Sequence, residues 1–178
     1  MGPYMPFLDV LGDLFGKTEN GLSDEEREEL GRLLSQQAPE LAELAVHANT
    51  TARIRAGFAA AFGTEDDPKA ARQRLFDAVF DLLAAASQAR PLVVVLEDVH
   101  WADEGTLNLL KYLVRRAGEA PVIYIATYRP EELTEDESGA RPCGRLLNQL
   151  DADGLRQEME LGSLDSAAVG QVARSLFL

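Results

Sequence analysis

Two adjacent acidic residues, Glu97 and Asp98, have the types and spacing best suited to chemistry in this 178-residue chain. They directly follow an uninterrupted apolar run, residues 92–96 (LVVVL), which begins after a proline. A short, Val-rich run of this kind predicts a strand that is buried on both faces in a parallel sheet. Such a strand ends at the sheet edge where open α/β proteins bind ligands, and two neighbouring carboxylates are costly there unless a cation or a proton donor meets them. The pair therefore predicts a site that takes a cationic or proton-donating partner at this edge of the sheet.

A second apolar run, residues 122–127, predicts a strand beside the first. Between the two runs, Asp103 can cap a Leu-rich helix. Strand, helix and strand in this order form a right-handed crossover, so the strands are parallel and their C-terminal ends face one crevice. The polar residues at these ends would then lie along one edge of the sheet: Glu97, Asp98, Thr127 and Arg129.

The rest of the chain predicts mostly helices, because apolar residues recur at helical spacing. The predicted helices cover residues 6–15, 23–34, 39–45, 52–62, 67–88 and 145–150, and a last one begins near residue 165. Ser23 and Glu26 have the spacing of a capping box at the start of one of them. Residues 131–142 predict an acidic surface loop, and alternation in residues 157–161 predicts a third, less buried strand.

Composition limits the classes of function. The formal charge of −13 argues against a nucleic-acid surface, which needs clustered lysine and arginine. A single cysteine, Cys143, permits no internal disulfide, and two histidines leave little material for a zinc site. No apolar run approaches the roughly 20 residues that span a bilayer, and the N-terminus does not have the pattern of a signal peptide. These features predict a soluble protein of the reducing cytoplasm.

One segment, Gly12 to Thr18, invites comparison with a phosphate-binding loop. That loop needs four residues between its two glycines, so that backbone N–H groups can wrap a phosphate at a helix N-terminus. This segment has three, and no apolar strand precedes it. It therefore favours a helix C-terminus with Gly16 as its cap and a solvated Lys17. The alternative, an irregular phosphate site, would be excluded if Lys17→Ala left nucleotide affinity intact.

Three stretches together resemble one known family: LEDVHWAD (residues 96–103), ATYRPEEL (residues 126–133) and PYMPF (residues 3–7). They are similar to the AAA-type ATPase domain of STAND-class P-loop NTPases, which include large LuxR-type transcriptional regulators and ATPases fused to adenylate cyclase or kinase domains. The resemblance implies an α/β fold with a three-layer, P-loop NTPase-like parallel sheet flanked by helices, incomplete at the N-terminus. Residues 1–162 would form a partial ATPase core, with a Walker B strand at 92–98 and a sensor strand at 122–129. Residues 163–178 would start a helical lid.

The resemblance also implies roles for the residues at the sheet edge. Glu97 would bind Mg²⁺, directly or through water, and Asp98 would orient or deprotonate the attacking water, although these two roles could exchange. Thr127 would hydrogen-bond the water or the phosphate, and Arg129 would reach the terminal phosphate. The open alternatives are a pair of solvated acids and, for Arg129, a salt bridge to Glu131 or Glu132. His100 and Trp101 are expected to fix the turn after the strand.

Two functions follow as expectations. The first is an ATP-binding module that uses ATP and Mg²⁺ in the complete protein, where slow hydrolysis switches an attached output domain. The chain alone would be inactive, because the Walker A phosphate loop is absent from it. Its partners would be ATP and other domains of the same protein, without direct contact to nucleic acid or membrane. The alternative is a non-catalytic regulatory or interaction module that has lost the nucleotide.

Overall fold

Two parallel strands lie at the centre of the fold in the computed structural model, which describes residues 4–15, 21–34, 68–88, 90–133 and 141–177. Strand β1 (Leu92–Leu96) pairs with β2 (Val122–Ala126), and the register runs from Leu92 opposite Val122 to Leu96 opposite Ala126. Helix α6 (Glu104–Arg115) connects the two strands. The predicted strand, helix, strand crossover and its parallel strands are therefore confirmed.

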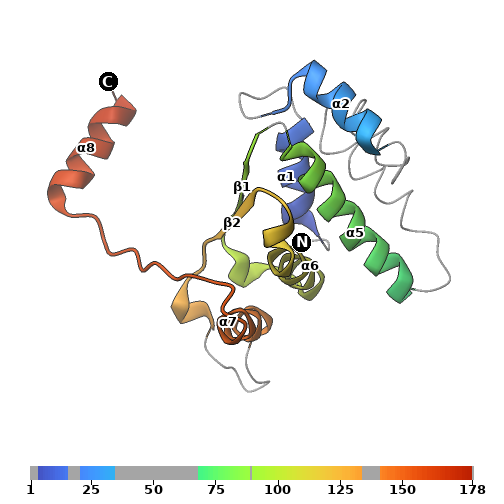
Figure 1. The fold of residues 1–178 in the computed structure, drawn as a ribbon. Helices are drawn as coiled ribbons and strands as arrows, with labels where there is room; N and C mark the ends of the chain where they lie inside the picture. Colours follow the sequence, from blue (N-terminus) through green and yellow to red (C-terminus); the bar gives the residue numbers. More distant parts are fainter. Residues whose placement is uncertain (1–3, 16–20, 35–67, 89, 134–140, 178) are drawn as a thin grey trace.

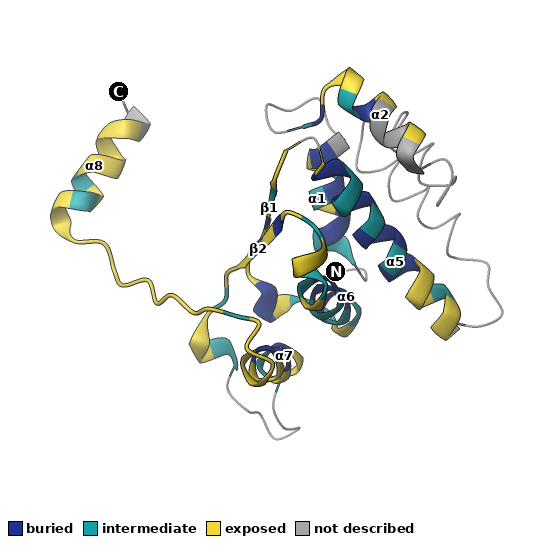
Figure 2. Cartoon of the chain, viewed as in Figure 1, coloured by how far each residue is buried: buried dark blue, intermediate teal, exposed yellow. Residues whose placement is uncertain are grey.

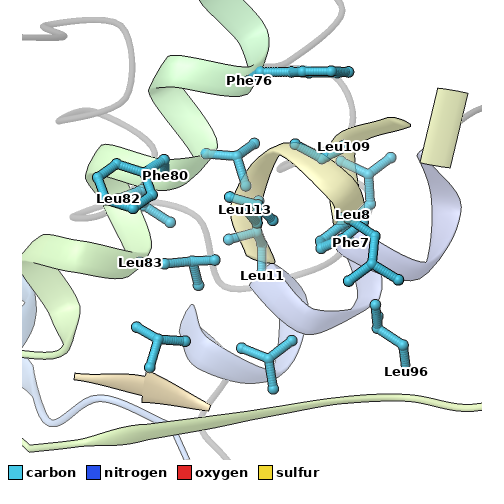
Figure 3. Packing of buried hydrophobic residues seen from close by; sticks show 14 of the residues in the cluster. Phe7, Leu8, Leu11, Phe76, Phe80, Leu82, Leu83, Leu96, Leu109 and Leu113 are labelled. Atoms are coloured by element: carbon cyan, nitrogen blue, oxygen red, sulfur yellow. The ribbon is translucent and has the colours of Figure 1, made fainter. Parts of the chain in front are cut away.

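Helices pack against one face of this sheet (Figure 1). They are α1 (Met5–Phe15), α5 (Pro68–Ala86) and α6, while α2 (Asp24–Leu34) packs on α5. The core between them is almost solely aliphatic and aromatic (Figure 3). Its most completely buried large side chains are Phe7 and Leu11 of α1, Leu82 and Leu83 of α5, and Leu109 and Leu113 of α6. The helical spacing of these residues is what lets each helix turn one apolar stripe inward.

The prediction that the strand at residues 92–96 is buried on both faces is wrong for the described residues, and β2 is not fully buried either. Val94 and Leu96 are buried, but Val93 between them is 58% exposed. In β2, Val122 is buried and Ile123 is 61% exposed (Figure 2). A continuous apolar run does not reveal how many faces are covered, and the described helices cover only one. A three-layer arrangement is thus not seen in the part of the chain that the structure describes.

The remaining elements largely follow the predictions. The capping box is present, because the Ser23 N–H donates to Glu26 Oε2 at 2.7 Å and the Glu26 N–H donates to Ser23 Oγ at 3.2 Å. The loop predicted at 131–142 begins instead with a short 3-10 helix, η3 (Pro130–Leu133), and α7 (Pro142–Ala152) starts at its end. Residues 134–140 and the helices predicted at 39–45 and 52–62 lie outside the described residues, as do Gly16 and Lys17.

The third strand predicted at 157–161 is not formed. This segment is extended, but it pairs with neither β1 nor β2, and Met159 is 81% exposed. Alternating polarity favours a strand only where a neighbouring strand supplies backbone hydrogen bonds, and the described part of the chain places no such strand beside this segment. Beyond it, α8 (Ser166–Phe177) lies apart from the core in Figure 1. None of the described helices combines the length and apolar character needed to cross a membrane.

Candidate active site

The turn after β1 presents the acidic pair to solvent. Glu97 and Asp98 are both exposed, and Asp98 has a left-handed backbone (φ 51°, ψ 42°). Aspartate is one of the few residues other than glycine that tolerates this conformation. Such strain costs about 1–3 kcal/mol and persists only where the surroundings fix it. The surroundings that fix Asp98 come from the neighbouring strand.

Thr127 joins the ends of the two strands. Its N–H donates to the Leu96 carbonyl at 3.0 Å, and its carbonyl accepts from the Val99 N–H at 2.9 Å. Its Oγ1 accepts from the Asp98 N–H at 3.0 Å. The hydroxyl was predicted to hydrogen-bond a water or a phosphate, and the structure shows that its oxygen already holds the Asp98 backbone. The hydroxyl proton remains available for donation to a ligand, because the oxygen acts here as the acceptor.

Arg129 follows β2 at the same end of the sheet and is exposed. The Glu132 carboxylate forms an ion pair with Arg141 at 3.6 Å. The Glu132 backbone N–H donates to the Arg129 carbonyl at 3.0 Å, so this contact involves the backbone of Arg129 and not its guanidinium. Among the described residues, no ion pair or hydrogen bond joins the Arg129 guanidinium to the acidic pair. The structure therefore brings Asp98 and Thr127 into direct contact and places Arg129 at the same end of the two strands.

His100 is buried directly beside the acidic pair, in the 3-10 turn η1 (Val99–Trp101). It is 6% exposed, and among the described residues neither ring nitrogen has a hydrogen-bond partner. Its Nδ1 lies 3.9 Å from Asp98 Oδ1. A buried polar group without a partner costs about 1–3 kcal/mol. The sequence pattern predicted only that His100 fixes the turn, and no local signal in it indicated that the ring lies this close to Asp98.

Trp101 is 62% exposed and lies with its ring centroid 5.2 Å from that of His100. Its large apolar surface therefore covers one side of the histidine ring rather than filling the core. Helix α7 packs against the same turn. The prediction that His100 and Trp101 shape this turn agrees with their positions.

Asp103 ends the turn by capping α6, as predicted. Its Oδ1 accepts from the Thr106 N–H at 3.0 Å, and its Oδ2 accepts from the Thr106 hydroxyl at 2.5 Å. Thr106 Oγ1 in turn accepts from the Tyr4 N–H at 3.1 Å, which ties the start of α1 to the start of α6. Gly105 is required beside them, because a Cβ there would meet Asp103 Oδ1 at 2.9 Å and the Tyr4 ring at 3.2 Å. Nothing in the sequence pattern indicated the roles of Gly105 and Thr106.

The site can accept a hard cation only through its acidic pair. Among the described residues, no group of three or more His, Cys, Asp or Glu side chains is placed to hold a metal ion. Mg²⁺ nevertheless needs only one or two protein carboxylates when phosphate oxygens and waters complete its shell. The exposed carboxylates of Glu97 and Asp98 fit that requirement, whereas a metal held by protein ligands alone does not fit.

Comparison with known proteins adds a family to this geometry. The sequence pattern described as the AAA ATPase domain matches residues 3–125, well over half of the chain. The match includes α1, β1 and the acidic pair, and it ends before Thr127 and Arg129. An uncharacterized protein of Rhizobium meliloti (strain 1021) is 36% identical over 93 residues, which are 52% of this chain and 9% of that protein. The chain thus spans only a small part of this relative. No solved structure matches the chain.

Proposed function

The chain belongs to the AAA ATPase domain family, and from this premise we propose that it forms part of a module that binds ATP with Mg²⁺ and hydrolyses it slowly as a switch. The observation that carries the proposal is the junction at the end of β1. There, two exposed carboxylates stand on a turn whose backbone is held by Thr127 of the neighbouring strand. A fixed backbone that presents free carboxylates is what a magnesium nucleotide and an attacking water require.

Each residue of the junction has a proposed role. Glu97 binds Mg²⁺, directly or through a water, and this ion neutralises charge on the phosphates when it is present. Asp98 orients or deprotonates the attacking water. Thr127 holds the Asp98 backbone and can donate its hydroxyl proton to the water or to a phosphate. Arg129 donates to the terminal phosphate, a role for which its exposed guanidinium has the right charge and geometry.

The wider context is a signalling or transcription-regulating protein of the STAND class. Two observations support it: the resemblance of residues 96–103 and 126–133, and a relative of which this chain spans only 9%. Residues 1–162 would then belong to the ATPase core and residues 163–178, which include α8, to the start of its lid. ATP and other domains of the same protein are the proposed partners. The competing proposal remains a regulatory scaffold without nucleotide.

Calorimetric titration of ATP, with and without Mg²⁺, tests the proposal. The complete phosphate-loop pattern, two glycines separated by four residues and followed directly by Lys and Ser or Thr, does not occur in the 178 residues, so the affinity of this chain by itself is expected to be low. The titration is therefore made on this chain and on the longer natural protein of which, under this proposal, it would be one domain. Binding that depends on Mg²⁺ in the natural protein is the expected result. Magnesium-dependent binding by the short chain that disappears with Lys17→Ala would instead reveal a phosphate site in residues 12–18.

Glu97→Gln separates the two proposed functions. In a nucleotide switch it should change ATP hydrolysis or the magnesium dependence of binding, because the amide lacks the charge that holds the ion. In a scaffold it should change neither. Glu160→Gln is the matched control, since Glu160 is equally exposed but lies in the extended segment before α8. Equal behaviour of both variants and the unaltered protein would contradict a nucleotide function for the acidic pair.

A further inference from the structure

The buried imidazole of His100 is the feature that the proposed roles do not use. Its side chain has no exposed surface, and among the described residues its two nitrogens make no hydrogen bond. The ring is nevertheless directed at the site, because Nδ1 lies 3.9 Å from Oδ1 of Asp98. A polar ring enclosed in this way must either stay unsatisfied or find its partner by a small movement nearby.

The partner that can move is the Asp98 side chain. Three backbone hydrogen bonds fix the peptide groups around it: Asp98 N–H to Thr127 Oγ1, Val99 N–H to the Thr127 carbonyl, and Trp101 N–H to the Asp98 carbonyl. The Asp98 carboxylate itself is 58% exposed, and no hydrogen bond from another described residue holds it. The His100 side chain, in contrast, is buried, with the Trp101 ring beside it and α7 packed against its turn. Rotation of the carboxylate about its own side-chain bonds is therefore the movement available.

That rotation has a short distance to cover. A hydrogen bond from a ring N–H to a carboxylate has a length of about 2.7–3.2 Å, roughly 1 Å less than the present separation. Because Nδ1 and Oδ1 are already 3.9 Å apart, a rotation of the Asp98 side chain can close the gap while the hydrogen bonds of the surrounding backbone stay in place. His100 is also the nearest residue able to carry opposite charge that the described chain offers to this carboxylate.

The geometry points to His100 as a positioning residue for Asp98. Nδ1–H donates to one carboxylate oxygen and so directs the other oxygen toward the attacking water. A carboxylate with one oxygen held and one free can present its lone pair to the water in a fixed direction, whereas a freely rotating one cannot. This inference rests on the proposed hydrolysis of ATP for its purpose, but the contact itself can be measured without nucleotide.

Nitrogen-15 spectra of the histidine side chains test the contact in the 178-residue chain. The chain has two histidines, so His47→Gln assigns the signals of His100. The expected result is a ring that carries a proton on Nδ1, with signals that shift in Asp98→Asn. Asparagine is chosen because it also tolerates the left-handed backbone. A ring protonated only on Nε2, or signals unchanged by Asp98→Asn, would overturn the inference.

Hydrolysis by the natural protein tests the purpose of the contact. His100→Asn keeps an N–H donor near the position of Nδ1, His100→Gln moves the donor to the position of Nε2, and His100→Leu removes it. We expect kcat to fall about 10- to 100-fold in the Gln and Leu variants, as for other groups that orient a ligating side chain, with KM for ATP unchanged and substantial activity in the Asn variant. Thermal unfolding of all three variants shows whether packing alone has changed.

A double-variant comparison shows whether His100 acts through Asp98. If it does, His100→Leu should have no further effect on kcat in a protein that already carries Asp98→Asn. Equal activity of His100→Asn and His100→Leu would contradict the positioning role. So would a double variant, Asp98→Asn with His100→Leu, in which the losses of the two single variants multiply. If the unaltered protein hydrolyses no ATP, the proposed function fails, and the nitrogen-15 spectra still decide whether His100 holds Asp98.

Discussion

Replacing Thr106 with valine would test the junction that ties the start of α1 to the start of α6. Thr106 is 1% exposed; its hydroxyl donates to Asp103 Oδ2 at 2.5 Å and accepts from the Tyr4 N–H at 3.1 Å. Valine has nearly the same shape but can make neither hydrogen bond. The change therefore removes two interactions while the volume of the side chain stays almost constant.

The expected loss of stability follows from these two hydrogen bonds. A bond to a charged group contributes about 1.5–3 kcal/mol and a neutral one about 0.5–1.5 kcal/mol, so the free energy of unfolding should fall by about 2–4.5 kcal/mol. In a chain of this length, each 1 kcal/mol lowers the melting temperature by about 2–4 °C. The melting temperature of Thr106→Val should therefore fall by about 4–18 °C.

Urea and thermal unfolding followed by circular dichroism would measure this loss. Thr106→Ser is the matched control, because serine keeps the hydroxyl and loses one methyl group, which is worth about 0.8 kcal/mol when buried. The serine variant should therefore be clearly more stable than the valine variant. If valine proved as stable as serine, the hydrogen bonds between α1, Asp103 and α6 would not stabilise the fold as argued.

Three further predictions concern separate parts of the chain. Gly105→Ala should lower the free energy of unfolding by about 1–3 kcal/mol, because its methyl group would overlap the Asp103 carboxylate that caps α6. Gly118 has open space around it, so Gly118→Ala is the control and should change this free energy little. Urea unfolding of both variants measures the difference. The Ser23 backbone N–H, which donates to Glu26 Oε2, is the main cause of the lowered pKa of Glu26 in the folded state. The stability that Glu26 contributes is therefore complete above the ordinary glutamate range and is lost as the pH falls through the lowered value. Glu26→Gln, which has no titrating group at this position, should flatten that part of the stability curve, and a curve identical to that of the unaltered chain would contradict this. Burial raises the pKa of the Cys143 thiol to about 11. A thiol reagent at pH 8 should therefore react far more slowly with the folded chain than with the chain in denaturant. Equal rates would show that the thiol is accessible in the folded chain.

The central crossover could be predicted from sequence because each of its parts has a strong local signal. The apolar run at 92–96, the cap at Asp103 and the Leu-rich helix after it all appear where expected. The covering of the sheet could not be predicted in the same way. Val93 and Ile123 have the character of core residues, yet whether they are buried depends on elements elsewhere in the chain, and the described helices leave them exposed.

The candidate site likewise contains some features that the sequence predicts and others that it does not. The acidic pair was visible in the sequence because it follows the strand directly, and the parallel pairing of the strands brings Thr127 beside it. The contact between His100 and Asp98 was not visible, because it depends on a left-handed backbone at an aspartate, for which the sequence carries no reliable signal. The strand predicted at 157–161 is not formed, because alternation in the sequence does not supply a strand to pair with, and none of the described segments pairs with these residues.

The left-handed backbone at Asp98 has a consequence for how this position tolerates change. Only glycine, asparagine and aspartate adopt that conformation readily, so a library of all substitutions at residue 98 should divide into two groups by cellular abundance. Glycine and asparagine should accumulate like the unaltered protein, and β-branched residues should be depleted. Within the abundant group, aspartate alone carries the charge that the proposed chemistry needs. At this one position, the abundance of a variant would depend on the backbone conformation, and its activity would depend on the side chain. The two requirements could therefore be measured separately.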